Sequence, residues 1–328
     1  MKRIFFAALA LVSMQAAHIQ ADNCCPQDEC FDPCGGWSVG ADFLYWNICK
    51  DNPDYAATLV SSTNELEATY QYAPIGWEPG FRVFLGKENV FCGWDFYASY
   101  TRVSADGDTK GLDDTNSTLV NTIGLTQKPA EAIAAQNNLT YQTFDVLLGY
   151  EFCFCKCQRI RPFFGIQGVK IKQQYAQVEI LQSSPTLSLN AVGWQSDYKA
   201  LGLELGTVYS YDLDCGVGLF TKTAVSFVAG NDDSELVDLV NNGSSIFVND
   251  LIDDRGLCTP GLQLQVGLTY EKCWCGWDFG FRVGYEFQNW WNVPLVRRYP
   301  ASGLPTSTHS TGGNLMMHGL FLGANVGF

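Results

Sequence analysis

The strongest constraint on the fold is a strict two-residue alternation of apolar and polar residues. In residues 262–271, the even positions are Leu, Leu, Val, Leu and Tyr, and the odd positions are Gln, Gln, Gly, Thr and Glu. Successive side chains of a strand point to opposite faces of a sheet, so this segment predicts a strand with one apolar and one polar face. Residues 277–288 repeat the pattern with aromatic residues on the apolar phase. Similar segments begin near residues 37, 81, 94, 144, 201 and 219.

Two architectures would produce such strands. In a soluble sandwich the apolar face is the interior, whereas in a membrane barrel it meets lipid and the polar face lines the lumen. Aromatic residues fill one face of strand after strand, while Gly and the charged residues share the other phase. This distribution favours the membrane barrel.

The composition agrees with many short strands. Of 328 residues, 47% are hydrophobic and 14% aromatic, only 16% are charged, and 32 are Gly. The formal net charge of −14 argues against nucleic acid as a partner, because phosphate binding needs clusters of Lys and Arg.

The first residues have the layout of a secretory signal peptide. Lys2 and Arg3 precede an apolar run, and small residues follow up to Ala21. An uncleaved anchor is the alternative, but the run is shorter than the ~20 residues of a spanning helix. The expected organisation is a signal peptide at 1–21, a Cys-rich periplasmic segment at 22–35 and a transmembrane barrel at 36–328.

Short and long connections alternate along the chain, as they do in bacterial outer-membrane barrels with short periplasmic turns and long outer loops. We expect an up-and-down antiparallel barrel of about ten strands, or about 12 to 14 if Leu66–Tyr72 and Ala176–Leu181 add strands. The long polar connections are expected near 49–79, 104–139, 174–197, 231–259 and 291–314. Within them, Pro129–Ala135 and Ser234–Val240 are predicted as short helices. The alternation slips near Gly168, which predicts a β-bulge there.

The polar phase carries the candidate functional residues. We expect nine charged residues to line the lumen: Asp42, Arg82, Asp95, Asp145, Glu204, Lys222, Asp278, Arg282 and Glu286. Six of these are acids and three are bases, which predicts a weak preference for cations. The alternative is that these charges pair across a plugged interior, as happens in small barrels.

Short repeats accompany the alternation. Cys92-Gly93-Trp94-Asp95-Phe96 recurs at 275–279, and Gly80-Phe81-Arg82-Val83 recurs at 280–283. A related phrase at 34–46 opens the predicted barrel, and Phe328 ends the last predicted strand on its apolar phase. With these motifs the chain resembles the Legionella-type major outer membrane protein family, including the Cys-rich porins of environmental chlamydiae. The resemblance implies a pore in the bacterial outer membrane, surrounded by its lipid and inserted by a barrel assembly machinery that recognises Phe328.

Two other classes of function were weighed. A barrel-borne hydrolase would need His, Asp or Ser at its outer rim, but His309 is a lone loop residue and His318 falls on the apolar phase. We therefore expect no enzyme, no catalytic residue and no cofactor. A structural or adhesive barrel that displays acidic surface loops is the alternative to the pore. A homo-oligomer is compatible with the sequence.

Cysteines form the last pattern. Eleven of the 13 cysteines lie in the N-terminal segment or beside the predicted short turns: Cys24, Cys25, Cys30, Cys34, Cys92, Cys153, Cys155, Cys157, Cys215, Cys273 and Cys275. Their spacing is not the paired Cys-x-x-Cys of zinc sites, so no metal is expected. Local disulfides are one interpretation. Because 13 is odd, at least one thiol stays free or pairs with another molecule, and disulfide links to other envelope proteins are the second interpretation. The resemblance to chlamydial envelope proteins implies the same.

Overall fold

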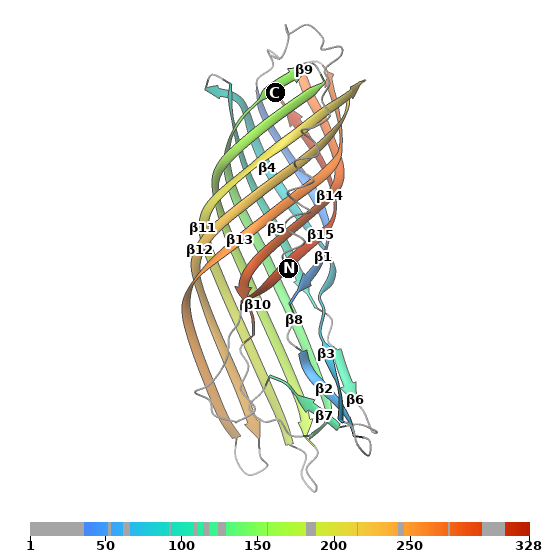
Figure 1. Ribbon diagram of the computed structural model, residues 1–328, viewed down its shortest axis with the longest axis vertical. Coiled ribbons are helices and arrows are strands. Elements are labelled where there is room, and N and C mark those ends of the chain that lie inside the picture. The colour runs from blue at the N-terminus through green and yellow to red at the C-terminus, as the bar shows by residue number, and fades with distance from the viewer. Residues whose placement is uncertain are drawn as a thin grey trace.

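The chain forms a closed, antiparallel β-barrel of ten strands in the computed structural model (Figure 1). The structure describes residues 36–51, 54–61, 66–91, 93–107, 110–113, 118–123, 129–155, 157–181, 188–214, 216–241, 246–274, 276–296 and 312–328. The ring consists of β1 (Trp37–Lys50), β4 (Gly76–Phe91), β5 (Trp94–Asp106), β8 (Pro129–Tyr150), β10 (Gln158–Leu181), β11 (Ser188–Asp214), β12 (Val217–Asn241), β13 (Ile246–Trp274), β14 (Trp277–Pro294) and β15 (Gly312–Gly327). The predicted fold class and strand number are confirmed. The predicted segments 1–21 and 22–35 lie outside the described residues.

The first and last strands close the ring. β1 pairs with β15 along its length, and the amide of Trp37 donates a hydrogen bond to the carbonyl of Phe328 over 2.8 Å. Trp37 and Phe328, where the barrel begins and the chain ends, therefore lie on the rim that carries the short turns. Since outer-membrane barrels place short turns and both termini in the periplasm, this is the periplasmic end.

Three of the short turns contain Gly with a positive φ angle. Gly93, Gly216 and Gly276 have φ values of +91°, +78° and +82°, which a side chain would disfavour. Each Gly follows a Cys in the sequence and precedes a strand. The repeated Cys-Gly dipeptide thus marks tight hairpins.

The strands are much longer than a membrane requires on one side of the barrel. β10, β11, β12 and β13 contain 24, 27, 25 and 29 residues, whereas a tilted strand crosses a bilayer with ~9–11 residues. They continue as a tall sheet beyond the outer end of the barrel, at the bottom of Figure 1. There the short strands β2 (Asp54–Ser61), β3 (Leu66–Tyr72), β6 (Lys110–Asp113) and β7 (Thr118–Asn121) join the sheet, and β9 (Phe152–Cys155) lies at the opposite end.

This sheet corrects several predicted boundaries. Most of the predicted connections 174–197 and 231–259 belong to strands, and the two predicted helices are parts of β8 and β12. Ser234–Val240 pairs with β11 on one side and β13 on the other, so hydrogen bonds to two neighbours outweigh its helical propensity. The segment Leu66–Tyr72 is a strand but pairs only with β2, outside the ring.

The predicted bulge near Gly168 is also wrong. β10 keeps an unbroken register with β11 and β8 through Gly168. On this strand Phe164 and Ile166 face outward, but farther on Val169 and Ile171 face inward while Lys170 and Lys172 face outward. The strand leaves the bilayer here, so water replaces lipid outside and a packed core replaces the polar lumen inside.

Two bands of aromatic residues frame the apolar outer surface. Near the periplasmic end, Trp277 packs against Phe328 with ring centres 5.7 Å apart, and Trp94 packs against Tyr150 at 5.5 Å. Near the outer end, Tyr45 stacks on Trp77 at 5.3 Å. Residues 37–45 of β1 connect the two bands, which matches the ~9–11 residues of a membrane-spanning strand. Aromatic girdles of this kind mark both interfaces of transmembrane barrels.

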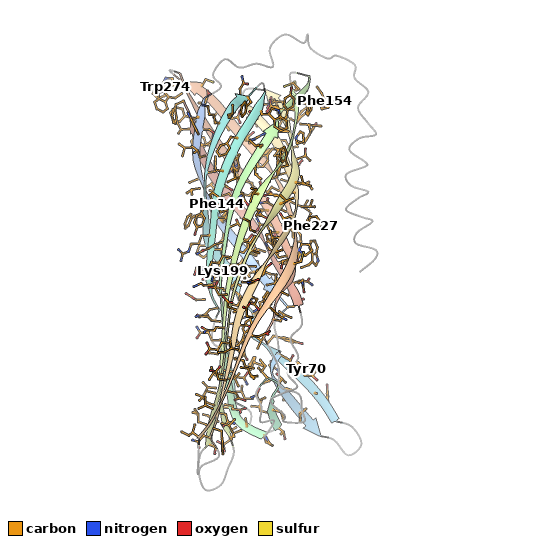
Figure 2. All side chains as sticks on the ribbon, turned by 90° about the vertical axis from the view of Figure 1, so that its left-hand side faces the viewer. Tyr70, Phe144, Phe154, Lys199, Phe227 and Trp274 are labelled. Carbon is orange, nitrogen blue, oxygen red and sulfur yellow. The ribbon has the colours of Figure 1, made fainter. Side chains whose placement is uncertain are left out.

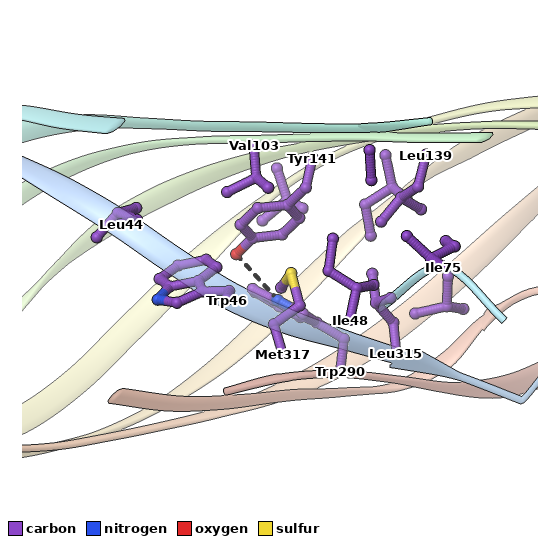
Figure 3. Packing of buried hydrophobic residues seen from close by; sticks show 14 of the residues in the cluster. Leu44, Trp46, Ile48, Ile75, Val103, Leu139, Tyr141, Trp290, Leu315 and Met317 are labelled. Atoms are coloured by element: carbon purple, nitrogen blue, oxygen red, sulfur yellow. Dashed lines mark hydrogen bonds between the residues drawn. The ribbon is translucent and has the colours of Figure 1, made fainter. Parts of the chain in front are cut away.

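Among the described residues the interior contains two large apolar clusters and a small one formed by Leu147, Phe163 and Ala224. The first, around Trp46, Tyr141, Trp290 and Phe321, fills the outer half of the lumen, and Figure 3 shows Trp290 donating a hydrogen bond to Tyr141 over 3.0 Å. The second lies farther out, between the tall sheet and the short strands β2 and β7, and includes Leu119, Ile133, Trp194 and Leu236. No helix of the described residues is long and apolar enough to cross a membrane.

Candidate functional site

A network of two arginines and two carboxylates lies on one wall of the lumen. Arg82 donates hydrogen bonds to both oxygens of Glu286, over 2.8 and 3.0 Å, and to Oδ2 of Asp42 over 3.4 Å. Arg282 holds the same Asp42 through two bonds of 2.8 and 2.7 Å. Asp42, Arg82 and Glu286 are 2%, 6% and 0% exposed. These four residues form a neutral, buried network that joins β1, β4 and β14.

The strand register explains why these residues meet. Asp42 lies directly opposite Arg82 on β4 and opposite Gly323 on β15, and Gly323 in turn lies opposite Arg282 on β14. A Cβ atom at Gly323 would stand 2.0 Å from Oδ1 of Asp42 and 3.0 Å from Cγ of Arg282. The missing side chain therefore lets Arg282 reach across one strand to Asp42.

A second group of charges lies on the opposite wall. Nζ of Lys222 is 3.4 Å from Oε1 of Glu204. The side-chain amide of Gln167 donates to Oδ1 of Asp145 over 2.7 Å and to Oε2 of Glu204 over 3.3 Å. Ser99 also donates to Asp145, over 2.9 Å. Lys222 thus pairs with Glu204, whereas Asp145 is held by neutral donors alone, so the group contains two carboxylates and one cation.

The two remaining acids of the predicted set lie near the periplasmic end. Asp95 follows the turn at Gly93 and pairs with Arg161, whose Nε lies 3.2 Å from Oδ2. Asp278 follows the turn at Gly276 and accepts a hydrogen bond from the thiol of Cys273. All nine predicted residues lie on the inward phase of their strands, but they form separate groups rather than one ring.

A cavity of about 160 Å³ lies between the two charged groups. Its wall includes Arg82 and Arg282 from the first group and Asp145 and Lys222 from the second. Toward the outer end the cavity meets the apolar cluster around Trp46 and Phe321. In this state the barrel holds an internal polar chamber, and aromatic side chains block its outward path.

The sequence pattern did not reveal this block. Leu44, Trp46 and Phe321 occupy the lumen-facing phase, which is predicted to be polar, yet they are apolar and 0%, 0% and 2% exposed. One signal was available, because both phases are apolar in Phe43-Leu44-Tyr45-Trp46. A strand that is apolar on both faces contacts lipid on one side and a packed core on the other.

Several buried polar atoms inside the barrel have no protein partner among the described residues. They include Nε1 of Trp46 and the Oε1 atoms of Gln167 and Gln173. Buried polar groups are almost always hydrogen-bonded, to ordered water where protein groups are missing. Ordered water would satisfy these atoms.

Three of the predicted rim cysteines have described side chains: Cys153, Cys157 and Cys273. All three lie at the periplasmic end, beside β9 and the turn at Gly276. Cys49 and Cys258 face outward in the outer half. Cys155 ends β9, and Cys24, Cys25, Cys30, Cys34, Cys92, Cys215 and Cys275 lie outside the described residues.

The described part of the chain holds no group of three or more His, Cys, Asp or Glu residues placed to bind a metal ion. His318 faces outward at the outer aromatic band, where Nδ1 lies 2.5 Å from the hydroxyl of Tyr285 and the ring meets Trp77 edge-on at 6.0 Å. It belongs to the membrane interface. His309 lies outside the described residues.

Comparison with known proteins gives a family. Residues 32–328 match the family described as Legionella pneumophila major outer membrane protein precursor. No curated protein sequence matches the chain.

Among solved structures, the outer membrane protease OmpT from Escherichia coli aligns over 94% of this chain and 99% of its own, with 10% identity and a TM-score of 0.41. A Pseudomonas aeruginosa FadL homologue aligns over 89% and 90%, with 7% identity and a TM-score of 0.28. The Pseudomonas putida toluene transporter TodX aligns over 89% of both chains, with 5% identity and a TM-score of 0.27. The match over residues 32–328, with the closed barrel and its aromatic girdles, confirms the predicted family and location: this chain belongs to the Legionella major outer membrane protein family and resides in the bacterial outer membrane.

Proposed function

We propose that this protein forms a narrow, gated pore for ions and the smallest hydrophilic solutes, with a preference for cations. The observation that carries the proposal is the charged interior around a polar chamber. A barrel that only had to be stable would gain from apolar residues at these positions, because replacing buried ion pairs by packed apolar side chains is often neutral or stabilising.

The unpartnered polar atoms support the same function. Trp46, Gln167 and Gln173 each bury a polar atom that needs water. Water at these atoms, together with the charged side chains of the chamber, would give an ion partners along its passage. Ten strands leave a narrow bore, so large solutes are excluded.

The aromatic cluster makes the pathway a gated one. Trp46, Tyr141 and Trp290 fill the lumen outward of the chamber, and the cluster around Leu119 and Trp194 lies farther out. Conduction requires the side chains of the first cluster to change rotamer and the short strands β2 and β7 to shift. Neither strand belongs to the closed ring, so their movement leaves the barrel intact.

Cation preference follows from the second charged group. The second group has two carboxylates, Asp145 and Glu204, but one cation, Lys222, which pairs with Glu204, while the Arg82 network is neutral. An excess negative charge in a confined, low-dielectric chamber enriches cations over anions.

The decisive experiment is single-channel recording in planar bilayers with the wild type, Trp46→Ala and Trp77→Ala. Trp46 blocks the lumen, whereas Trp77 lies on the lipid side and serves as a matched control. We expect brief, small openings for the wild type and Trp77→Ala, and more frequent or larger openings for Trp46→Ala. The reversal potential in a KCl gradient should show cation preference, and Asp145→Asn should weaken it. If neither the wild type nor a folded Trp46→Ala barrel conducts above the lipid baseline, the pore is rejected, and a reversal potential of the opposite sign rejects cation preference.

A second candidate is a structural role in the envelope, through disulfides to neighbouring proteins. It is favoured by the position of Cys153, Cys157 and Cys273 at the periplasmic end, where an oxidising compartment maintains disulfides. Thiol-blocked envelopes run on non-reducing gels should then show ladders that collapse with reductant. A sharp monomer band would remove this role and leave the pore untouched. Should the barrel neither conduct nor cross-link, display of the acidic outer sheet remains as its structural or adhesive role.

A further inference from the structure

A cluster of cations lies on the outer surface of the barrel, where the strands leave the bilayer. Arg102, Lys170 and Lys199 belong to one cross-strand row, in which Arg102 and Lys170 lie on either side of Gln142, and Lys170 lies directly opposite Lys199. Lys172 lies in the next row, opposite Asp197. We call Arg102, Lys170, Lys172 and Lys199 the cationic patch; it spans β5, β8, β10 and β11.

The patch directly adjoins the lipid-facing surface. The row on its membrane side contains Tyr100, Phe144, Gly168 and Leu201, and Phe144 and Leu201 are 55% and 64% exposed. Figure 2 shows Lys199 just beyond the band that holds Phe144 and Phe227, on the side toward the outer end. The two rows are two residues apart on each strand, so hydrocarbon contact and positive charge occupy successive outward-facing positions.

The patch keeps a positive balance despite three neighbouring acids. Asp197 lies 3.7, 3.9 and 3.1 Å from the ammonium groups of Lys170, Lys172 and Lys199, and Asp233 lies 4.0 Å from Lys199. Four cations against these two carboxylates and Asp254, which lies opposite Asp233 in the same row, leave one positive charge in a chain whose net charge is −14. The side chains of Lys172 and Lys199 remain 54% and 55% exposed, so their ammonium groups are open to a ligand.

The opposite sector of the same interface is built differently. On β1, β4, β14 and β15 the outward residues at the outer band are Tyr45, Trp77, Tyr285 and His318. Aromatic rings suit any lipid interface, whereas clustered lysines are selective for negative charge. The barrel thus presents one neutral and one anion-seeking sector to the outer leaflet.

We propose that the cationic patch binds the phosphate groups of a phosphorylated outer-leaflet lipid, whose acyl chains lie along Phe144, Leu201 and their neighbours. The continuity with the apolar surface selects a lipid over a soluble anion, because one molecule then fills both surfaces. Asp197 lies within 4 Å of the three ammonium groups and competes with the lipid phosphates for them.

The proposal is tested with the full-length folded protein in detergent, by native mass spectrometry with defined lipids. The probes are a diphosphorylated lipid A, the same lipid with both phosphates removed, and inorganic phosphate as competitor. The test variant is K170Q/K172Q/K199Q, and K170R/K172R/K199R tests rescue by charge. K87Q/K272Q removes two outward lysines at the periplasmic end and serves as the matched control.

We expect the wild type, the arginine variant and the periplasmic control to retain the phosphorylated lipid and to bind the dephosphorylated one more weakly. A cation near an anionic lipid surface changes affinity by about fivefold, so the triple glutamine variant should bind on the order of a hundredfold more weakly. Asp197→Asn, which removes a competing carboxylate, should bind several-fold more tightly.

Three outcomes would overturn the proposal. The first is equal binding of the two lipids by the wild type, which would mean that the acyl chains alone are recognised. The second is unchanged binding by a triple glutamine variant that still shows the heat-dependent gel mobility of a folded barrel. The third is displacement of the lipid by inorganic phosphate at concentrations comparable to that of the lipid, which would make the patch a site for free anions.

Discussion

Removal of Arg82 is the most informative single perturbation of the interior. Arg82→Met keeps much of the aliphatic volume but deletes four hydrogen bonds: two to Glu286, one to Asp42 and one to Thr101 at 3.0 Å. Asp42 keeps its two bonds from Arg282, so its charge stays compensated. Glu286 keeps only neutral donors, Gln263 at 2.6 Å and Gln288 at 2.7 Å. The uncompensated charge therefore falls on Glu286, which is fully buried.

Breaking a buried ion pair by removing one partner costs about 3–5 kcal/mol. We expect Arg82→Met to lower the free energy of unfolding by that amount. Glu286→Met should cost less, because Arg82 still reaches Asp42 and Thr101. The double variant removes both charges and leaves a methionine pair, so it should recover most of the loss, with a coupling energy of at least about 2 kcal/mol.

The assay is reversible urea unfolding in lipid vesicles, followed by tryptophan fluorescence and by the heat-dependent shift in gel mobility. Lys272→Met, at an exposed periplasmic position, is the control and should change stability by no more than about 0.5 kcal/mol. The reasoning is refuted if Arg82→Met costs less than about 1 kcal/mol, or if the two single losses simply add in the double variant.

Three further predictions concern other parts of the molecule. Burial lowers the pKa of Lys50, outside the membrane-spanning segment, from 10.5 to about 7, so its protonation opposes folding below about pH 7 and the penalty fades as the pH rises toward 10.5. Lys50→Met should therefore raise the stability by as much as about 5 kcal/mol near pH 6 and by little near pH 10.5, and a gain that is independent of pH would contradict this. Phe281→Arg puts a charge at mid-bilayer and should cost about 2–4 kcal/mol in vesicle refolding, against little for Phe281→Leu; equal refolding of the two would place residue 281 away from lipid. Gly276→Ala should cost about 1–2 kcal/mol for its positive φ alone, whereas Gly216→Ala should cost more, because its Cβ would stand 2.2 Å from the carbonyl oxygen of Glu271; equal losses in urea unfolding would argue against that clash.

The fold was predictable because the bilayer imposes one rule on every strand. Between the girdles, lipid selects apolar residues on one phase, so residues such as Leu264 and Phe281 reveal strand, face and approximate length together. Beyond the outer girdle the rule reverses, as Ile166 and Lys170 on β10 illustrate. When the apolar phase changes sides along one strand, the pattern resembles a β-bulge or a loop. For this reason the sequence predicted a bulge at Gly168 and loops where the structure has the tall sheet.

The charged residues of the interior could be identified but not paired. Arg82 and Glu286 are 204 positions apart, and the ring closure that joins β1 to both β4 and β15 brings their strands together. The spacing of these residues in the sequence does not show that their strands are close together in the barrel. The aromatic block around Trp46 was not predicted for a related reason. The sequence shows an apolar residue on the lumen phase, but not which residues of the opposite wall it packs against.

The seam between β1 and β15 has a consequence for how the barrel is made. β1 has two partners, β4 and β15, and the second of these is the last strand of the chain. Until residues 312–328 arrive, β1 and β14 each expose a row of unpaired backbone donors and acceptors, which the hydrocarbon core cannot satisfy. Until then, the incomplete sheet needs surroundings that satisfy the backbone donors and acceptors of these two edges. Insertion and closure are therefore expected to be coupled, and the hydrogen bonds between Trp37 and Phe328 belong to the step that removes both exposed edges.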